Sequence, residues 1–264
     1  MKKLVIFDFD GTLVDSFSNR IHSHRKVAEL ITEFLKSRGI DADYETILKK
    51  VIKTEEEREK RLSRSRDEWW KQILKEYNVT DVPQDFITKL TNIYWEILKD
   101  TTTIYEGAPE LLKELKQKGY KLGLLSDTDF APGWKEKRFK ASGLADYFDI
   151  LVVAGETNPE AKPSPQPFLE VLKRLNIKRE QAVHVGDNQE TDIKGAKAAG
   201  IDAIWIDWQG NPNGNKYGAQ AVAKGFPELK KTLYKFLGIK NQTQNKQKNS
   251  YKEKGIRAGK SIFP

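Results

Sequence analysis

An apolar run that ends in two aspartates limits the folds open to this chain more than any other segment. Leu4–Phe7 holds only large apolar side chains, and Asp8, Asp10 and Gly11 follow it closely. A short run closed by polar residues and glycine predicts a buried strand of a parallel sheet, followed by a tight turn. Ligands bind at the carboxyl ends of strands in such sheets, and neighbouring carboxylates repel each other. We therefore expect the aspartate pair to serve a cation or a reaction.

Further apolar runs recur along the chain, with helical patterns between them. The predicted strands lie at 120–126, 150–154, 182–186 and 203–206. The predicted helices lie at 109–118, 134–142, 166–175, 191–199 and 227–237. Strands that alternate with helices of this length predict βαβ units and a parallel sheet, so the expected fold class is α/β.

Residues 16–103 interrupt this alternation, because they contain no strand-like run. Their apolar spacing predicts four helices, at about 17–38, 43–53, 65–77 and 84–99. Three tryptophans in this stretch are expected in its core, with substrate stacking as the alternative: Trp69, Trp70 and Trp95. The charged run 55–61 is expected on a solvated helix face or connector, since alternating charge at that density should not be buried. We therefore expect an all-helical insertion after the first strand.

The net charge of +8 suggests nucleic-acid binding, but its location weakens that idea. Residues 240–264 hold seven Lys or Arg and one acid, whereas residues 1–239 hold 39 basic and 37 acidic residues. The last segment is also rich in Asn and Gln and poor in apolar residues, so we expect a flexible basic tail. A solvated extension is favoured over an arm that binds nucleic acid.

Composition also bounds the class of protein. The chain has no cysteine, which excludes disulfides and thiolate metal sites. The start of the chain runs directly into the first predicted strand and not into a signal sequence, and no apolar stretch approaches the roughly 18 residues of a membrane span. We expect a cytoplasmic protein without membrane contacts, and the sequence leaves the oligomeric state open.

Polar residues that can take part in a reaction or bind a ligand follow the predicted strands. They are Asp8, Asp10, Ser126, Asp127, Lys162, Asp187 and Asp192. In a parallel sheet these groups converge on one edge. Such a set suits phosphoryl transfer, because carboxylates hold a hard cation such as Mg²⁺ and one of them can attack phosphorus. A second carboxyl can act as acid and base, while the lysine and the hydroxyl hold the phosphoryl oxygens.

The order of these segments is typical of one family. They are Asp8-Phe9-Asp10-Gly11-Thr12-Leu13, the apolar strand that ends in Ser126, Lys162-Pro163, and Gly186-Asp187 with Asp192. In these motifs and in the segments that connect them, the chain resembles the haloacid dehalogenase (HAD) superfamily, in its phosphatase branch with a helical cap. The resemblance covers residues 3 to about 207. The resemblance implies a Rossmann-like core of residues 1–15 and 104–239, a helical cap of residues 16–103, and the tail 240–264.

The resemblance also implies roles for the two aspartates. Asp8 would be the nucleophile and a magnesium ligand. Asp10 would be the general acid and base, with its backbone carbonyl on the metal. Family members that attack carbon lack an acid/base aspartate at this place, so Asp10 favours phosphate chemistry. The expected activity is Mg²⁺-dependent hydrolysis of a small phosphorylated metabolite, a phosphate monoester, through an aspartyl-phosphate.

The remaining motifs would bind the phosphoryl group and the metal. Ser126 and Lys162 would contact the phosphoryl oxygens. Asp127 stands where many relatives have Asn, so we expect its side chain to face away and its backbone N–H to face the site. Asp187 would be a direct metal ligand, and Asp192 a direct or water-mediated ligand or a partner of Lys162.

The substrate is not identified by these motifs. The first cap helix usually faces the active site in this family, which makes Arg20 and His24 candidates for substrate contacts, with a solvated helix face as the alternative. Phosphoglycolate, sugar phosphates, nucleotides and pyrophosphate all stay open as substrates. Two other functions stay open as well: a phosphomutase of the β-phosphoglucomutase type, and a non-enzymatic binding protein on the same fold.

Overall fold

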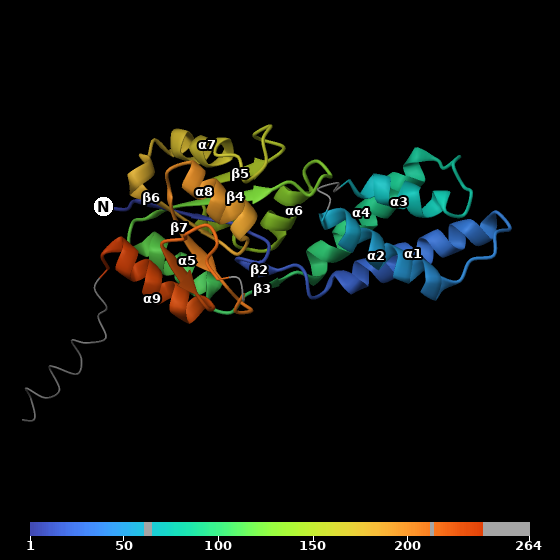
Figure 1. Ribbon diagram of the computed structural model, residues 1–264, viewed down its shortest axis with the longest axis horizontal. Coiled ribbons are helices and arrows are strands. Elements are labelled where there is room, and N and C mark those ends of the chain that lie inside the picture. Colours follow the sequence, from blue (N-terminus) through green and yellow to red (C-terminus); the bar gives the residue numbers. More distant parts are fainter. Residues whose placement is uncertain (61–64, 212–213, 240–264) are drawn as a thin grey trace, which may run out of the picture.

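A six-stranded sheet forms the centre of the computed structural model, which describes residues 1–60, 65–211 and 214–239 (Figure 1). The strand order is β5-β4-β1-β6-β7-β8, and every neighbouring pair is parallel. The strands are β1 (Leu4–Phe7), β4 (Lys121–Asp127), β5 (Ile150–Ala154), β6 (Ala182–Gly186), β7 (Asp202–Ile206) and β8 (Ala221–Ala223). The predicted α/β class and parallel sheet are confirmed. The sequence did not predict β8, because three residues are too few to form a recognisable apolar pattern.

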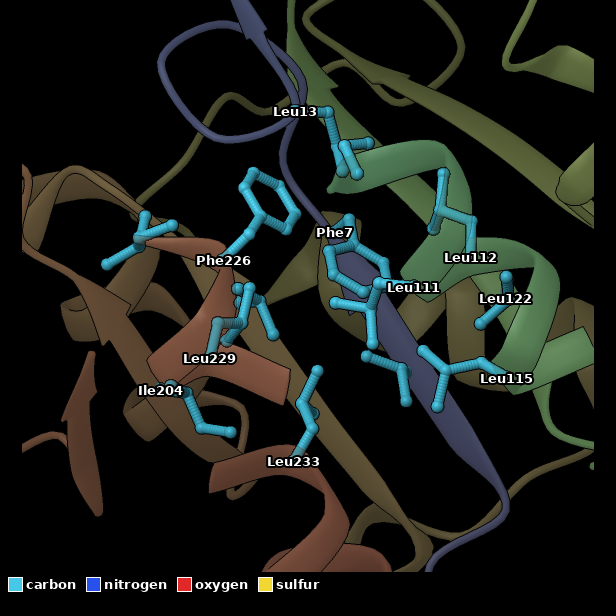
Figure 2. Packing of buried hydrophobic residues seen from close by; sticks show 14 of the residues in the cluster. Phe7, Leu13, Leu111, Leu112, Leu115, Leu122, Ile204, Phe226, Leu229 and Leu233 are labelled. Carbon is cyan, nitrogen blue, oxygen red and sulfur yellow. The ribbon is translucent and has the colours of Figure 1, made fainter. Parts of the chain in front are cut away.

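Helices cover both faces of the sheet, so β1 is buried on both sides. They are α5 (Ala108–Gln117), α6 (Trp134–Ala141), α7 (Gln166–Leu175), α8 (Lys194–Ala198) and α9 (Phe226–Leu237). Phe7 packs with Leu111 of α5 and Leu229 of α9 on one face, as Figure 2 shows. Ile6 belongs to the cluster on the other face, together with Phe168 of α7. Each large apolar side chain buried in this way contributes about 1.5–3 kcal/mol, and together they hold the end of β1 in place.

The described residues between β1 and α5 form four α-helices, which extend to one side of the sheet (Figure 1). They are α1 (Arg20–Ser37), α2 (Tyr44–Lys60), α3 (Arg66–Lys75) and α4 (Gln84–Thr101). They share a hydrophobic cluster of their own, which includes Ile31, Trp70 and Leu90. The chain enters and leaves them through two short antiparallel strands, β2 (Val14–Asp15) and β3 (Thr103–Ile104). The helices match the predicted number and order, and α2 runs further than predicted because its charged end consists of good helix formers.

The buried position of Glu55 in α2 contradicts the expectation that the charged run 55–61 is solvated. Its side chain is only 3% exposed and accepts hydrogen bonds from Arg66 Nη2 at 2.8 Å and Tyr94 Oη at 2.9 Å. A carboxylate can be buried where other helices supply cations and donors, and the local sequence does not reveal such partners. The next two residues of the run, Glu56 and Glu57, are exposed. The side chains of residues 58–61 lie outside the described part of the structure.

Two further expectations concern the basic tail and membrane spans. The predicted basic tail, residues 240–264, lies outside the described residues. Within the described ranges, none of the helices combines the length and the apolar character that a membrane span requires.

Candidate active site

One cavity of about 520 Å³ gathers most of the predicted site residues. Its lining includes Asp8, Asp10, Ser126, Asp127, Lys162, Asp187 and Arg20. The first six stand at or after the carboxyl ends of β1, β4, β5 and β6, as the parallel sheet requires. Residues of α1, α3 and α4 line the same cavity, so it lies between the sheet and the inserted helices. Asp192 and His24 do not belong to the lining.

Lys162 joins two of the carboxylates. Its Nζ donates a hydrogen bond to Asp8 Oδ1 at 2.7 Å and another to Asp192 Oδ1 at 2.6 Å, and all three side chains are buried. Burial, opposed by Lys162 and reinforced by Asp192, raises the pKa of Asp8 to about 7. Burial also disfavours the Asp192 anion, but Lys162 and His184 outweigh it and lower the pKa of Asp192 to about 2. Asp192 therefore carries the negative charge that balances Lys162, which leaves Asp8 only partly compensated.

The backbone around Asp192 is shaped to admit its carboxylate. A π-helical turn, η3 (Gln189–Ile193), begins after Asn188, whose side chain accepts hydrogen bonds from the first turn. Asp192 Oδ2 accepts a hydrogen bond from Asn188 N at 3.1 Å. A Cβ atom on Gly186 would overlap the Asp192 carboxylate, so glycine is needed at the end of β6. This turn replaces the start of the predicted helix 191–199.

A cluster of three carboxylates at this edge can hold a hard divalent cation. Asp8, Asp187 and Asp192 each offer an oxygen, and these oxygens lie within 4.8 Å of one another. Burial, together with the charges of Asp8 and Asp192, raises the pKa of Asp187 well above its usual range. Gly11 adopts a φ of +77°, and a Cβ atom there would overlap the Asp187 carboxylate. These three carboxylates carry more negative charge than one lysine neutralises. Carboxylate oxygens are also the ligands that Mg²⁺ prefers, so the cluster suits this ion.

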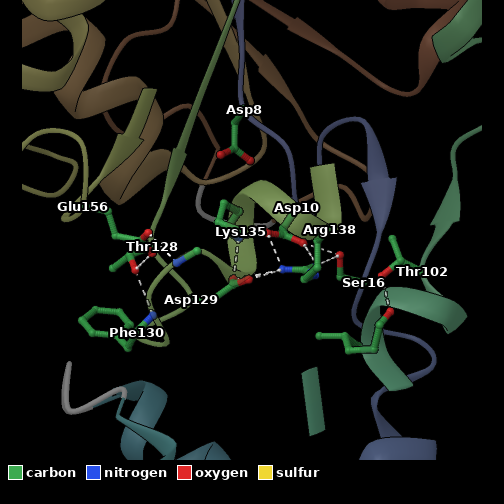
Figure 3. A network of polar contacts seen from close by, with 12 residues as sticks. Asp8, Asp10, Ser16, Thr102, Thr128, Asp129, Phe130, Lys135, Arg138 and Glu156 are labelled. Atoms are coloured by element: carbon green, nitrogen blue, oxygen red, sulfur yellow. Dashed lines mark hydrogen bonds and ion pairs between the residues drawn. The ribbon is translucent and has the colours of Figure 1, made fainter. Parts of the chain in front are cut away.

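Asp10 lies in a separate network with two cations of α6, which Figure 3 shows. Its carboxylate contacts Lys135, Arg138 and the Ser16 hydroxyl. Arg138 Nη1 also donates to Asp129 Oδ1 at 3.0 Å and Oδ2 at 3.1 Å. Burial opposes ionisation of Asp10, but Arg138 and Lys135 outweigh it and hold its pKa well below the usual range. Asp10 is therefore ionised here, as a base must be, and it must move away from these cations before it can donate a proton.

The sequence reasoning missed the partners of Asp10. Lys135 and Arg138 stand three residues apart on the helix that follows the Ser126 strand, so they share one helix face. That spacing was a usable signal, because the helix had to pack close to the strand ends. Asp129 gave no such signal, since its loop follows no regular pattern.

Ser126 and Asp127 occupy the end of β4. Ser126 is 2% exposed and lines the cavity. Asp127 Oδ1 accepts a hydrogen bond from the backbone N–H of Lys162 at 2.9 Å, which ties the Lys162 loop to β4. The Asp127 carboxylate is thus turned toward the Lys162 backbone, although the residue also lines the cavity.

Of the two substrate-contact candidates on the inserted helices, Arg20 lines the cavity and His24 does not. His24 is buried, does not line the cavity and contacts Glu55, so neither a substrate contact nor a solvated helix face describes it. Arg20 lines the cavity, as does Arg66, which the sequence reasoning missed because nothing in its local pattern marks it. Trp69 and Trp95 belong to the core of the inserted helices, as predicted, and also line the cavity.

Comparisons with known proteins agree with this geometry. The profile of the haloacid dehalogenase-like hydrolases matches residues 2–200. Glyceraldehyde 3-phosphate phosphatase of Pyrococcus furiosus is 29% identical over 206 residues, which cover 78% of this chain and 81% of the relative. Phosphoglycolate phosphatase of Aquifex aeolicus is 31% identical over 206 residues, which cover 78% of this chain and 85% of the relative. Among solved structures, a HAD phosphatase from Thermococcus onnurineus aligns with a TM-score of 0.63 and 27% identity, covering 88% of this chain and 98% of the other.

Proposed function

Because the chain belongs to the haloacid dehalogenase-like hydrolase family, we propose that it hydrolyses small phosphate monoesters through an aspartyl-phosphate on Asp8. The observation that carries this proposal is the contact of Lys162 with Asp8 beside the buried carboxylate cluster. Two relatives are named as phosphatases of glyceraldehyde 3-phosphate and of phosphoglycolate, and these names support the choice of phosphate esters.

The first half of the reaction would use Asp8 as the nucleophile. Its free carboxylate oxygen attacks phosphorus, and the bond from phosphorus to the leaving oxygen breaks. Lys162 and the Ser126 hydroxyl hold the phosphoryl oxygens, while Lys162 keeps its contact with the carboxylate. Asp8, Asp187 and the backbone carbonyl of Asp10 would hold Mg²⁺. Asp192 would be a further direct or water-mediated ligand or the partner of Lys162. When bound, the ion neutralises the negative charge that otherwise separates phosphate from carboxylate.

Asp10 would move protons in both halves. It gives a proton to the leaving oxygen, and it later takes one from the water that hydrolyses the aspartyl-phosphate. The ion pairs with Lys135 and Arg138 favour the second task in the observed arrangement. The first task requires Asp10 to exchange these contacts for the leaving oxygen when substrate binds.

We propose that residues 1–15 and 104–239 form the catalytic core and that residues 16–103 act as a cap over it. The separate hydrophobic cluster of α1–α4 and the short β2–β3 pair at the junction support this division. Closure of the cap would exclude bulk water from the cavity.

Phosphate release from a panel of phosphate esters with Mg²⁺ tests the proposed function. The Asp8→Asn variant should lose turnover while it keeps its fold, because the amide is a poor nucleophile. Asp202→Asn is the matched control: this carboxylate pairs with Lys2 at the start of β7, away from the cavity, and should keep full activity.

Three outcomes of that assay would contradict the proposal. Appreciable turnover by Asp8→Asn would exclude Asp8 as the nucleophile. An isomerised sugar phosphate without phosphate release would favour a phosphomutase. Failure to hydrolyse any ester, including p-nitrophenyl phosphate, would favour a non-enzymatic binding protein.

A further inference from the structure

Two indole N–H groups at the end of β7 hold the two loops that meet at the carboxylate cluster. Trp205 lies in β7, and its Nε1 donates a hydrogen bond to the backbone carbonyl of Asp187 at 2.8 Å. Trp208 follows the strand, and its Nε1 donates to the backbone carbonyl of Gly11 at 2.6 Å. Asp187 follows β6, and Gly11 lies in the turn after β1, which is two strands away from β7 in the sheet. The end of one strand is therefore tied to both loops.

The two loops touch each other where the indoles hold them. A Cβ atom on Gly11 would lie 2.3 Å from Asp187 Oδ2, so this carboxylate rests on the glycine backbone. The hydroxyl of the next residue, Thr12, lies 3.4 Å from Asp187 Oδ1. A displacement of either loop would therefore move the Asp187 carboxylate relative to Asp8 and Asp192, the other members of the cluster.

Packing constrains Asp187 less than it constrains a core residue, because Asp187 lies between two cavities. It lines the active-site cavity and also a second cavity of about 440 Å³, whose lining includes Trp205 and Trp208. Atoms that face a cavity have no packing partners on that side. The hydrogen bond from Trp205 therefore has a large part in holding the Asp187 backbone.

Trp208 is itself held by aromatic contacts. Its ring stacks on that of Tyr105, with centroids 4.2 Å apart and planes 25° apart, and lies 5.9 Å from the Phe226 ring of α9. Tyr105 follows β3 directly, and its backbone N–H donates to the carbonyl of Leu13 at 3.1 Å. The stack fixes the direction of the Trp208 indole N–H, although the side chain is 39% exposed.

We propose that Trp205 and Trp208 are positioning residues of the cation site, which set its affinity for Mg²⁺ through the backbones of Asp187 and Gly11. This inference rests on the proposed function, because it takes the carboxylate cluster as the Mg²⁺ site. An indole has one N–H, and each of these donates to a carbonyl, so the tryptophans act through the loops and not on the ion. Removal of groups that orient metal ligands typically weakens metal binding about 10–100-fold.

Trp208→Phe tests the proposal, because it removes the indole N–H and keeps an aromatic ring against Tyr105. Calorimetric titration with Mg²⁺ alone should give a Kd for this variant about tenfold higher than that of the wild-type protein. Trp205→Phe should raise the Kd in the same way. Trp205 is 4% exposed and Trp208 is 39% exposed, so Trp208→Phe keeps the proposal testable if Trp205→Phe does not fold.

Trp70→Phe is the matched control. It removes an indole N–H that donates to Thr91 Oγ1 at 3.0 Å within the inserted helices, away from the carboxylate cluster. Its Tm should fall, because a buried hydrogen bond is lost, but its Kd for Mg²⁺ should equal that of the wild-type protein. If Trp208→Phe behaves like this control, with an unchanged Kd, the indole has only a structural role and the proposal is overturned.

Turnover at different Mg²⁺ concentrations gives a second readout. Saturating Mg²⁺ should restore most of the activity of Trp208→Phe, because mass action compensates for weaker binding. A deficit that saturating Mg²⁺ does not relieve would show a disturbance beyond the cation site and would overturn the proposal.

Binding and turnover together distinguish a failure of this inference from a failure of the proposed function. If the wild-type protein binds Mg²⁺ but hydrolyses no ester, the proposed function fails, and the ratio of the two Kd values still decides the inference. If the wild-type protein hydrolyses esters and the Kd values are equal, the inference alone fails. A wild-type protein that does not bind Mg²⁺ overturns both.

Discussion

Arg138 of α6 lies over the indole ring of Trp95 from α4, with its guanidinium carbon 5.3 Å from the ring centroid. The same guanidinium contacts Asp10 and donates two hydrogen bonds to Asp129. One side chain thus connects the inserted helices with the aspartate that we propose as acid and base. Any shift of α4 relative to α6 changes the surroundings of that aspartate.

Arg138→Gln should move the pH dependence of turnover. Arg138 is the strongest influence that lowers the pKa of Asp10, so its removal lets that pKa rise. The limb of the kcat/KM profile that reports Asp10 should move to higher pH, with about a tenfold loss of rate. Lys140→Gln, which changes an exposed cation of the same helix, should leave the profile unchanged. A slower variant with an unshifted profile would contradict the role given to Asp10.

Asp187→Asn should stabilise the protein in the absence of metal. The folded-state pKa of Asp187 lies above its unfolded value near 3.8, so stability is lost as the pH rises past that value. At neutral pH the amide removes this cost. Thermal unfolding with a chelator should show the gain, and added Mg²⁺ should raise the Tm of the wild-type protein much more than that of the variant.

The Asp202→Asn variant is the control for that experiment. It should respond to Mg²⁺ as the wild-type protein does, since Asp202 pairs with Lys2 outside the carboxylate cluster. If Asp187→Asn gains as much stability from Mg²⁺ as the wild-type protein, Asp187 is not a metal ligand.

Gly11→Ala should disrupt the cation site through its new methyl group. Gly11 and Gly39 have similar φ values of +77° and +72°, so alanine costs about 1–2 kcal/mol of backbone strain at either position. A Cβ atom meets the Asp187 carboxylate only at Gly11, because nothing lies within 4 Å of it at Gly39. Phosphate-release assays should show about a 100-fold loss for Gly11→Ala and little loss for Gly39→Ala. Similar activity in the two variants would show that the close approach has no consequence.

Glu55→Gln should weaken the inserted helices in a pH-dependent way. Burial raises the pKa of Glu55, but Arg66 and the His24 contact outweigh it and hold that pKa below its usual range. The carboxylate therefore stabilises the fold above its unfolded pKa near 4.5, and this contribution is lost as the pH falls through the lower folded pKa. Urea unfolding should give a difference of about 3 kcal/mol from the wild-type protein at pH 7, shrinking below about pH 4.5.

Glu57→Gln, on the exposed face of the same helix, is the control for Glu55. Its ion pair with Lys53 spans 3.7 Å between exposed groups, so the change should be within about 0.5 kcal/mol at every pH. A constant difference for Glu55→Gln across the pH range would mean that packing, and not charge, explains its effect.

The amino-acid sequence by itself determined five of the six strands of the central sheet, their parallel arrangement and the residues at their ends. Leu4–Phe7 forms a strand because its apolar side chains are stabilised by burial. Asp8 lies at the edge of the sheet because the strand ends just before it. Asp187 reaches the same edge because parallel strands end on the same side. These features depend on local periodicity and on a general rule of sheets, so they can be read residue by residue.

Only the tertiary structure decided which side chains of separate elements meet. The burial of Glu55 depends on Arg66 from α3, and the ionisation of Asp10 depends on Arg138 from α6. Trp95 is both a core residue and part of the cavity wall because α4 faces the sheet at that position. Such pairings are long-range contacts between surfaces whose orientation no local pattern encodes, and they set the charge of the cavity walls.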